Sequence, residues 1–164
     1  MNIRPITTLH PNGQRVRDAL DELGIASPIV ETLDPSPTAA AAAAQLDIDV
    51  GQVANSLIFD VDGDPILIMT SGAHRVDTRA LALFLGANDV RRPDAAFVRT
   101  HTGQPIGGVA PVGHPAPLRT IVDTALARWS TVWAAGGHPH YVFATSFDEL
   151  MGMTRGVAFD VGGA

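Results

Sequence analysis

The sequence contains no cysteine, which excludes disulfide bonds, thiolate zinc sites and a cysteine nucleophile. Lysine is also absent, so all eleven basic residues are arginine. No stretch approaches the roughly 20 apolar residues that a membrane-spanning helix needs. Residues 1–10 lack a basic segment followed by a long apolar run, which a secretory leader would have. We therefore expect a cytoplasmic protein that does not associate with a membrane.

Composition and charge fit one globular domain over residues 1–164. The chain has 164 residues, of which 46% are hydrophobic and 17% charged, and this is enough to build one core without a disordered tail. The net charge of -6 argues against a protein that wraps a long phosphate backbone, although it is compatible with contact to one RNA end. No heptad pattern is present, and the sequence gives no prediction of an oligomeric state.

Local signals predict strands and helices that intermix along the chain, as in a mixed α+β fold. Asn12 is predicted to cap a helix that ends at Leu23, before Gly24. Asp62-Gly63 predicts a tight turn between the strands of a hairpin. Capping boxes are predicted at 49–52 and 146–149. Further helices are predicted at 38–46, 77–85 and 94–102, the two hairpin strands near 54–59 and 65–69, and other strands near 29–33, 120–122, 131–133, 141–143 and 157–161.

A loop rich in glycine and proline interrupts this pattern in the middle of the chain. The segment Gly103–Pro117 contains four glycines and four prolines, too many for regular structure. Glycines let a backbone approach a ligand closely and let neighbouring N–H groups converge, while prolines stiffen the loop. The segment therefore predicts either an oxyanion-binding loop or an ordinary rigid turn.

Residues Thr102–His114 resemble the signature TGxxxGGVxPxGH of the YbaK/ProX family of aminoacyl-tRNA editing proteins. The segments 53–59 and 71–77 resemble the motifs of that family that lie upstream of the signature, and Gly72 and Asp77 match in the second of them. Residues 135–140, with Val142 and Phe143, resemble its second loop and the strand that follows. The resemblance extends over roughly residues 16–161, which is nearly the whole chain.

This resemblance implies a fold, a site and an activity. The fold would be a mixed, largely antiparallel, curved sheet flanked by helices, with an aminoacyl pocket between the two loops and the strand that carries Asn55. The activity would be that of a trans-acting hydrolase that removes a small, wrongly attached amino acid from tRNA, with tRNA for proline as the expected substrate. The implied partners are the aminoacylated acceptor end of tRNA and an aminoacyl-tRNA synthetase, and no cofactor is implied.

Hydrolysis of an aminoacyl ester needs mainly a positioned water molecule and a stabilised oxyanion, because the ester is already activated and its ribose offers a neighbouring hydroxyl. We expect Gly107 and Gly108 to donate main-chain N–H groups to the oxyanion. Replacement of Gly108 by a bulky residue is then expected to abolish deacylation and leave the fold intact. The sequence has no G-x-S-x-G, H-E-x-x-H, Walker or G-x-G-x-x-G motif, as expected for a reaction without a nucleophilic triad.

Asn55 departs from the family pattern, because many members carry a lysine at the matching position that is implicated in substrate binding or transition-state stabilisation. Asparagine forms hydrogen bonds but brings no charge, and Arg75 is a candidate substitute for the missing cation. Two other functions stay open: a non-catalytic module that binds the aminoacyl-tRNA end, and an esterase that acts on small aminoacyl compounds.

Other residues are predicted to contact the substrate. His138 and His140 would share one face of a strand, but they lack a third ligand, so we predict no metal site. Asp60, Asp62 and Asp64 are interpreted as a solvated hairpin tip and not as a calcium loop. The predicted substrate-binding residues are Ser56, Arg75, Gly103, Val109, Pro111, Gly113, His114, Gly137, His138 and His140.

Overall fold

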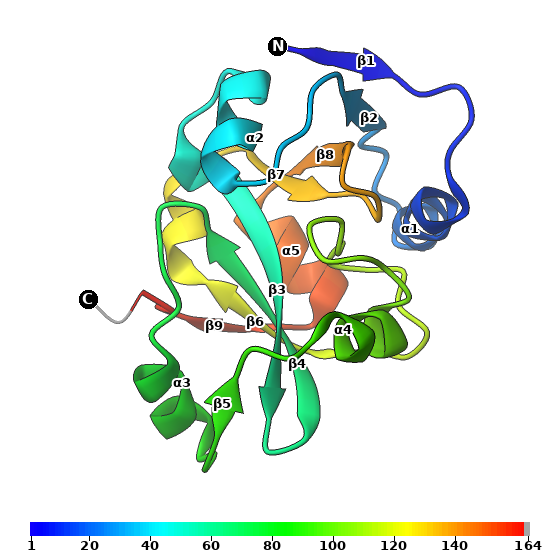
Figure 1. Cartoon of the computed structure of the whole chain (residues 1–164). Coiled ribbons are helices and arrows are strands. Elements are labelled where there is room, and N and C mark those ends of the chain that lie inside the picture. The colour runs from blue at the N-terminus through cyan, green and yellow to red at the C-terminus, as the bar shows by residue number, and fades with distance from the viewer. Residues whose placement is uncertain (163–164) are drawn as a thin grey trace.

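The computed structural model describes residues 1–162, which form one nine-stranded sheet flanked by five α-helices (Figure 1). The strand order is β1-β2-β8-β7-β3-β4-β6-β9, and β5 also pairs with β3. The strands are β1 (Ile3–Pro5), β2 (Ile29–Thr32), β3 (Val53–Val61), β4 (Asp64–Ser71), β5 (Val90–Arg91), β6 (Arg119–Asp123), β7 (Val132–Ala135), β8 (Tyr141–Thr145) and β9 (Val157–Phe159). The helices are α1 (Pro11–Glu22), α2 (Ala39–Leu46), α3 (Thr78–Leu85), α4 (Ala95–Thr102) and α5 (Phe147–Thr154), with short 3₁₀ turns at Val50–Gln52 and Thr124–Arg128.

The hairpin of β3 and β4 forms the centre of the sheet, as its Asp-Gly turn predicts. Asp62 and Gly63 both have positive φ, 51° and 94°, as a type I′ turn requires. The carboxylate of Asp60 accepts a hydrogen bond from the Gly63 amide at 2.8 Å, so the acidic tip serves the turn. Parallel pairs join β3 to β7, β4 to β6 and β6 to β9, while the other pairs are antiparallel. The predicted mixed, largely antiparallel α+β fold is confirmed.

Alternate residues of β4 pack into two cores on opposite faces of the sheet. Leu67 and Met69 lie in the larger core, which α1, α4 and α5 complete. Ile66 and Ile68 lie in the smaller core with Leu81 of α3. Both faces of β4 are therefore covered, which explains the uninterrupted apolar run in its sequence. Within residues 1–162, no helix has the length and apolar character to cross a membrane.

Most predicted helix ends are confirmed, while one N-cap, one capping box and the end of the last strand differ. Asn12 is not the cap of α1: the helix begins at Pro11, and the His10 side chain accepts the hydrogen bond from the Asn12 amide. Proline is favoured at that first position because its missing N–H needs no partner there. The capping box at Ser146 is half formed, because Glu149 accepts from the Thr145 hydroxyl. The last strand ends at Phe159, two residues earlier than predicted.

The sheet divides at β3, and this creates the space for a site. Along one edge of β3, β7 pairs with Val53 and Ala54 and β5 pairs with Asp60 and Val61. Between these two contacts, residues 55–59 pair only with β4 on the other side. An unpaired stretch of strand edge presents free main-chain N–H and C=O groups. The middle of β3 is thus open although it lies in the centre of the sheet.

Candidate functional site

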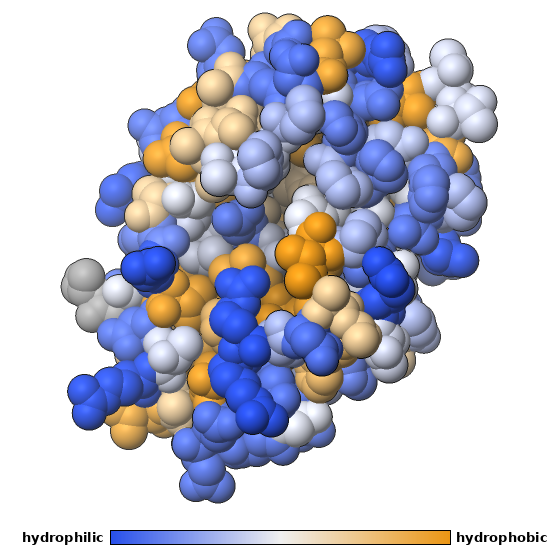
Figure 2. Space-filling view, viewed as in Figure 1, coloured by the Kyte–Doolittle hydropathy of each residue, from blue (hydrophilic) through white to orange (hydrophobic). Residues whose placement is uncertain are grey.

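A cavity of about 280 Å³ lies against the open edge of β3. Its walls come from the segment Ser36–Ala39 and α2, from β3, β7 and β8, and from the loop residues Ile106, Gly107 and Val109. Pro139 of the second predicted loop also lines it. Figure 2 shows this face of the molecule hollowed below α2. The cavity therefore lies where the sequence predicted a pocket, between two loops and the strand of Asn55.

Asn55 and Ser56 both line this cavity, as predicted. Within residues 1–162, the Asn55 side chain forms no hydrogen bond with the protein, while the Ser56 hydroxyl donates to the Met69 sulfur at 3.2 Å. The Val53 carbonyl accepts from the Gly72 amide on the β4 side, and main-chain groups alternate in direction along an antiparallel strand. The N–H and C=O groups of Ser56 and Ile58 consequently point to the open edge. The cavity thus offers main-chain donors and acceptors beside the Asn55 amide.

The two adjacent glycines of the loop differ in their surroundings. Gly107 lines the cavity, has a φ of +89°, and no atom would lie within 4 Å of an added Cβ. Within residues 1–162, its amide forms no hydrogen bond. Gly108 is buried behind this wall, and its amide donates to the Pro105 carbonyl at 3.0 Å. Gly107 is therefore the open donor, whereas a role for Gly108 as a second donor requires that its present hydrogen bond opens.

Gly108 also fixes the contact between the two loops. A Cβ at this position would lie 2.8 Å from the carbonyl carbon of His138 and 2.9 Å from the nitrogen of Pro139. Backbone atoms cannot rotate away from such a clash as a flexible side chain can. This packing argues against the expectation that a bulky residue at Gly108 would leave the fold intact.

Gln104 holds the glycine-proline loop in shape, and the sequence analysis missed it. Gln104 is 2% exposed, and its side-chain oxygen Oε1 accepts a hydrogen bond from the main-chain N–H of Ala110 at 2.7 Å. Its amide nitrogen donates to the Val112 carbonyl at 3.4 Å. The buried Thr102 hydroxyl accepts a hydrogen bond from the main-chain N–H of Gln104 at 3.0 Å. A polar side chain within an otherwise apolar and glycine-rich stretch was the signal that could have identified this internal connection.

Three other glycines predicted as substrate contacts shape the backbone. Gly103 ends α4 in the left-handed conformation. A Cβ at Gly113 would lie 3.2 Å from the Val16 nitrogen, and one at Gly137 would lie 2.8 Å from the Asn12 carbonyl oxygen. Both loops therefore pack directly on α1. Among the predicted loop contacts, Val109 lines the cavity, while Pro111, Gly113 and His114 line a separate depression near Met153.

His114 is largely buried on the far side of the loop from the cavity. Its Nε2–H donates to the Ala110 carbonyl at 2.7 Å, so the ring and Gln104 hold the same residue of the loop. Burial lowers the pKa of His114 below its ordinary value, and the hydrogen bond to Ala110 opposes this shift in part. The structure thus places His114 as a support for the loop and outside the cavity.

The lowered pKa of His114 predicts a loss of stability in acid. The unfolded chain binds this proton more readily than the folded chain does. The contribution of neutral His114 to the free energy of unfolding is therefore complete above the ordinary pKa of about 6.5, and it is lost as the pH drops from there through the lower pKa of the folded state. We expect the free energy of unfolding in urea to fall less between pH 7.5 and pH 5.5 for His114→Gln than for the wild type. Equal slopes for the two proteins would contradict this assignment.

His138 and His140 lie beside the cavity in a cluster with His10. The His138 ring centroid lies 5.5 Å from that of His10, 5.9 Å from that of His140 and 4.7 Å from that of Tyr141, which lines the cavity. Burial lowers the pKa of His138, and its proximity to His10 and His140 lowers it further. The His140 Nδ1–H donates to the carbonyl of Thr32, also a cavity residue, at 3.0 Å. Both histidines therefore support the cavity wall.

The cation that lines the cavity is Arg92, not the predicted Arg75. Arg92 follows β5, and its guanidinium carbon lies 5.2 Å from the centroid of the Phe59 ring, a cation–π arrangement. Arg75 lines a shallow depression next to the cavity, and Arg92 and Asn55 line that depression too. No local sequence signal distinguished Arg92 from its neighbour Arg91.

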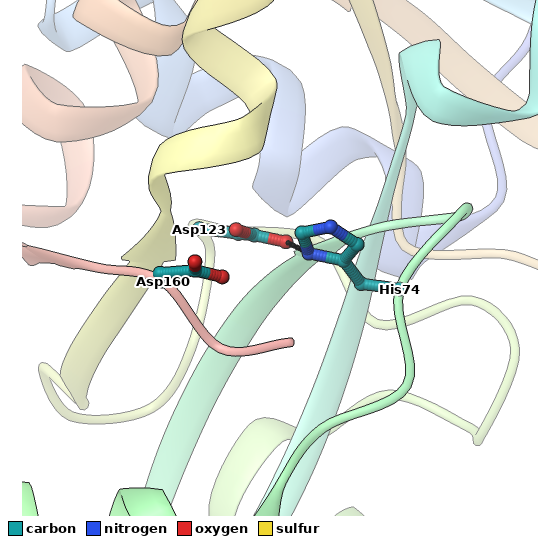
Figure 3. Close-up of side chains that lie close together, drawn as sticks. All are labelled: His74, Asp123 and Asp160. Carbon is teal, nitrogen blue, oxygen red and sulfur yellow. Dashed lines mark hydrogen bonds and ion pairs between the residues drawn. The ribbon is translucent and has the colours of Figure 1, made fainter. Parts of the chain in front are cut away.

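A second cluster brings together His74, Asp123 and Asp160 (Figure 3), with ligand atoms within 4.8 Å of one another. Asp123 is completely buried, and its Oδ2 accepts from the Ser71 amide at 3.0 Å and from His74 Nδ1 at 2.8 Å. Its Oδ1 accepts from the Ala125 amide at 3.0 Å. These bonds connect β4, β6 and the segment after β4. Since the lone pairs of Asp123 are used in this way, we assign the cluster a structural role.

Comparison with known proteins agrees with this geometry. A family model described as an aminoacyl-tRNA editing domain matches residues 34–153. A crystal structure described as that of a candidate trans-editing enzyme for prolyl tRNA synthetase superposes with a TM-score of 0.89 at 35% identity, covering 94% of this chain and 99% of that one. The protein YwhH of Bacillus subtilis, uncharacterized, is 29% identical over 123 residues, which cover 74% of this chain and 78% of YwhH.

Part of the chain also matches a larger enzyme. The proline–tRNA ligase of Lysinibacillus sphaericus is 30% identical over 81 residues, which cover 49% of this chain but only 14% of the ligase. The resemblance to YbaK-type editing proteins that the motifs predicted is confirmed by the family model and the superposed structure. The chain belongs to the aminoacyl-tRNA editing domain family.

Proposed function

We propose that this protein is a trans-acting deacylase that hydrolyses the ester between a wrongly attached small amino acid and tRNA, with tRNA for proline as its substrate. The observation that carries the proposal is the cavity at the open edge of β3, which Asn55 and Gly107 both line; within residues 1–162 neither the Asn55 side chain nor the Gly107 amide forms a hydrogen bond. The matches to proline–tRNA ligase and to a structure described as a candidate trans-editing enzyme support proline as the tRNA identity.

The reaction would need one water molecule and no covalent intermediate. The water oxygen attaches to the ester carbonyl carbon, the bond from that carbon to the ribose oxygen breaks, and a proton passes from the water to the ribose oxygen. The products are the free amino acid and tRNA with its terminal hydroxyl restored. The Gly107 amide would stabilise the oxyanion that forms on the ester carbonyl oxygen. The Asn55 amide would bind the ester or the attacking water.

The walls of the cavity support a small amino acid whose side chain carries no positive charge. Among residues 1–162, those that line it include no carboxylate, and its one charged residue is Arg92. The remaining walls combine apolar residues of all sizes, from alanines to Trp133, with the hydroxyl-bearing residues Thr32, Ser36, Thr38, Ser56 and Tyr141. At about 280 Å³ the cavity is near the lower end of the range for small-molecule sites. A long side chain would not have the space, and a basic side chain would meet Arg92 and find no carboxylate as a partner.

The decisive experiment is deacylation of tRNA for proline that carries alanine, serine, cysteine or proline, measured as release of labelled amino acid by the pure protein. We expect at least one of the small non-cognate esters to be cleaved much faster than prolyl-tRNA. If the aminoacyl-tRNA binds but no ester is cleaved, the protein is a binding module. If simple aminoacyl esters are cleaved as fast as the tRNA-bound ones, it is a small-molecule esterase.

A lysine at position 55 is expected to increase the rate. Asn55 lines the cavity, and within residues 1–162 its side chain has no hydrogen-bond partner. Asn55→Lys would bring a cation to the reacting ester, and a charge-assisted hydrogen bond is worth about 1 kcal/mol more than a neutral one. We therefore expect kcat/KM to rise by about fivefold to tenfold. The control is Asn55→Met, which has a long side chain without charge. A rise in both variants, or in neither, would contradict a role for charge here.

A further inference from the structure

A second, shallower depression continues from the cavity along β3. Asn55 and Leu57 of β3 and Arg92 line both hollows, so the two share a wall. The far side of the depression is formed by the segment after β4, from His74 to Thr78. Its volume is about 470 Å³, larger than that of the cavity itself. A molecule whose end occupies the cavity would therefore extend into this depression.

Two arginines without acidic partners lie in this depression. Arg75 and Arg92 are exposed, and within residues 1–162 neither forms an ion pair. The adjacent Arg91 differs, because its Nε lies 3.3 Å from Asp60 and 3.7 Å from Asp89. Figure 2 shows a band of strongly hydrophilic side chains below the hollow. The depression thus carries two unpaired cations in a chain with a net charge of -6.

Two carboxylates in the segments around Arg75, those of Asp77 and Asp123, have partners inside the protein. Asp77 caps α3 and accepts from the Ala80 amide at 3.0 Å. Asp123 is buried and accepts from His74 Nδ1 at 2.8 Å, and Asp160 completes that cluster (Figure 3). The ring of Phe59 holds the Arg92 guanidinium in place. Arg75 and Arg92 are consequently available for an anion that comes from outside the protein.

We propose that this depression binds a phosphodiester of the RNA acceptor end, with Arg92 and Arg75 as its ligands. This inference rests on the proposed function for the identity of the RNA. The terminal nucleotide carries its phosphate on the same ribose whose hydroxyl bears the amino acid, so a phosphate lies within one ribose of an ester bound in the cavity. Guanidinium groups bind phosphate oxygens through paired hydrogen bonds. Contact with a single phosphate would let a protein with a net negative charge bind the end of an RNA without a broad basic surface.

Two substrates that differ by one phosphate test this assignment. Adenosine and adenosine 5′-monophosphate, each esterified on the ribose with the preferred amino acid, are compared by kcat/KM. We expect the wild type to prefer the phosphate-bearing ester by about tenfold, in line with one charge-assisted contact. The preference should fall to about two or less in Arg92→Gln and in Arg75→Gln. The charge-matched control is Arg119→Gln, which changes an arginine in a separate depression beside Val61 and Asp62 and should keep the preference. Equal preferences in all four proteins would overturn the proposal.

A binding experiment with an acceptor-stem hairpin RNA that carries no amino acid separates this proposal from the proposed activity, because binding can be measured without turnover. We expect Arg75→Gln and Arg92→Gln each to weaken binding and to reduce the slope of log K against log salt by roughly 0.7, the value for one phosphate on a single strand. If these changes appear but no ester is cleaved, the phosphate site stands and the hydrolase proposal fails. If millimolar inorganic phosphate displaces the hairpin at constant ionic strength, the site binds free phosphate and the proposal is wrong.

Discussion

Gly108→Val is expected to lower deacylation by about a hundredfold and to destabilise the protein by about 1–3 kcal/mol. The cause is steric, because a Cβ on Gly108 would lie within 2.9 Å of main-chain atoms of His138 and Pro139. The two loops would have to separate, which would displace Gly107 and Pro139, both residues of the cavity lining. The measurements are the rate of amino acid release and the free energy of unfolding in urea.

Two alanine variants provide a matched comparison for this prediction. Gly108→Ala introduces only the clashing Cβ, whereas an added Cβ on Gly152, within α5, meets no atom within 4 Å. We expect Gly108→Ala to lose both activity and stability, and Gly152→Ala to keep activity and gain about 0.5–1 kcal/mol from its higher helix propensity. An active, stable Gly108→Ala protein would show that the loops do not need this close approach.

Gln104→Ala is expected to cost about 2–4 kcal/mol of stability and to lower deacylation at least tenfold. The variant would leave the Ala110 amide and the Val112 carbonyl without their partner inside the protein, and a buried unpaired polar group costs about 1–3 kcal/mol. The loop that carries Gly107 would then lose its internal connection. Urea denaturation gives the first quantity and the rate of amino acid release the second.

An exposed glutamine on α1 serves as the control for this change. The Gln14 side chain donates to Asp18 at 2.9 Å on the helix surface, so Gln14→Ala should change stability by less than about 0.5 kcal/mol. Gln104→Glu adds a second comparison, because it keeps the size but brings a carboxylate next to the Val112 carbonyl. We expect it to be at least as damaging as alanine. A Gln104→Ala protein as stable as Gln14→Ala would refute the structural role of Gln104.

Local signals predicted the elements of the fold, because each depends on residues close in sequence. The Asp62-Gly63 turn fixes the register of β3 and β4, and Thr38, Asp77 and Asp94 cap the helices that follow them. The short strands β1 and β5 were not predicted, since two or three residues carry no detectable alternation. Their place depends on pairing with distant strands.

The motifs in the sequence identified some of the residues that line the cavity, but not all of them. Asn55, Ser56, Gly107 and Val109 all line it. The motif Thr102–His114 also includes Gly113 and His114, which contact the protein behind the loop and do not line the cavity. A pattern of residue types does not distinguish residues that contact a ligand from residues that contact the rest of the protein. Arg92 lies outside every motif, and its position depends on the pairing of β5 with β3.

The division of the sheet at β3 makes the lengths of two neighbouring strands decisive for the cavity. Extension of β7 by one further pair past Ala54, or of β5 back past Asp60, would place hydrogen-bonded backbone where the ester is expected to bind. A two-residue insertion in either strand would thus close the entrance even if every residue of the glycine motif were kept. Conversely, an amino acid exchange at position 55 leaves this opening intact, because the opening is set by main-chain pairing and not by the side chain at that position.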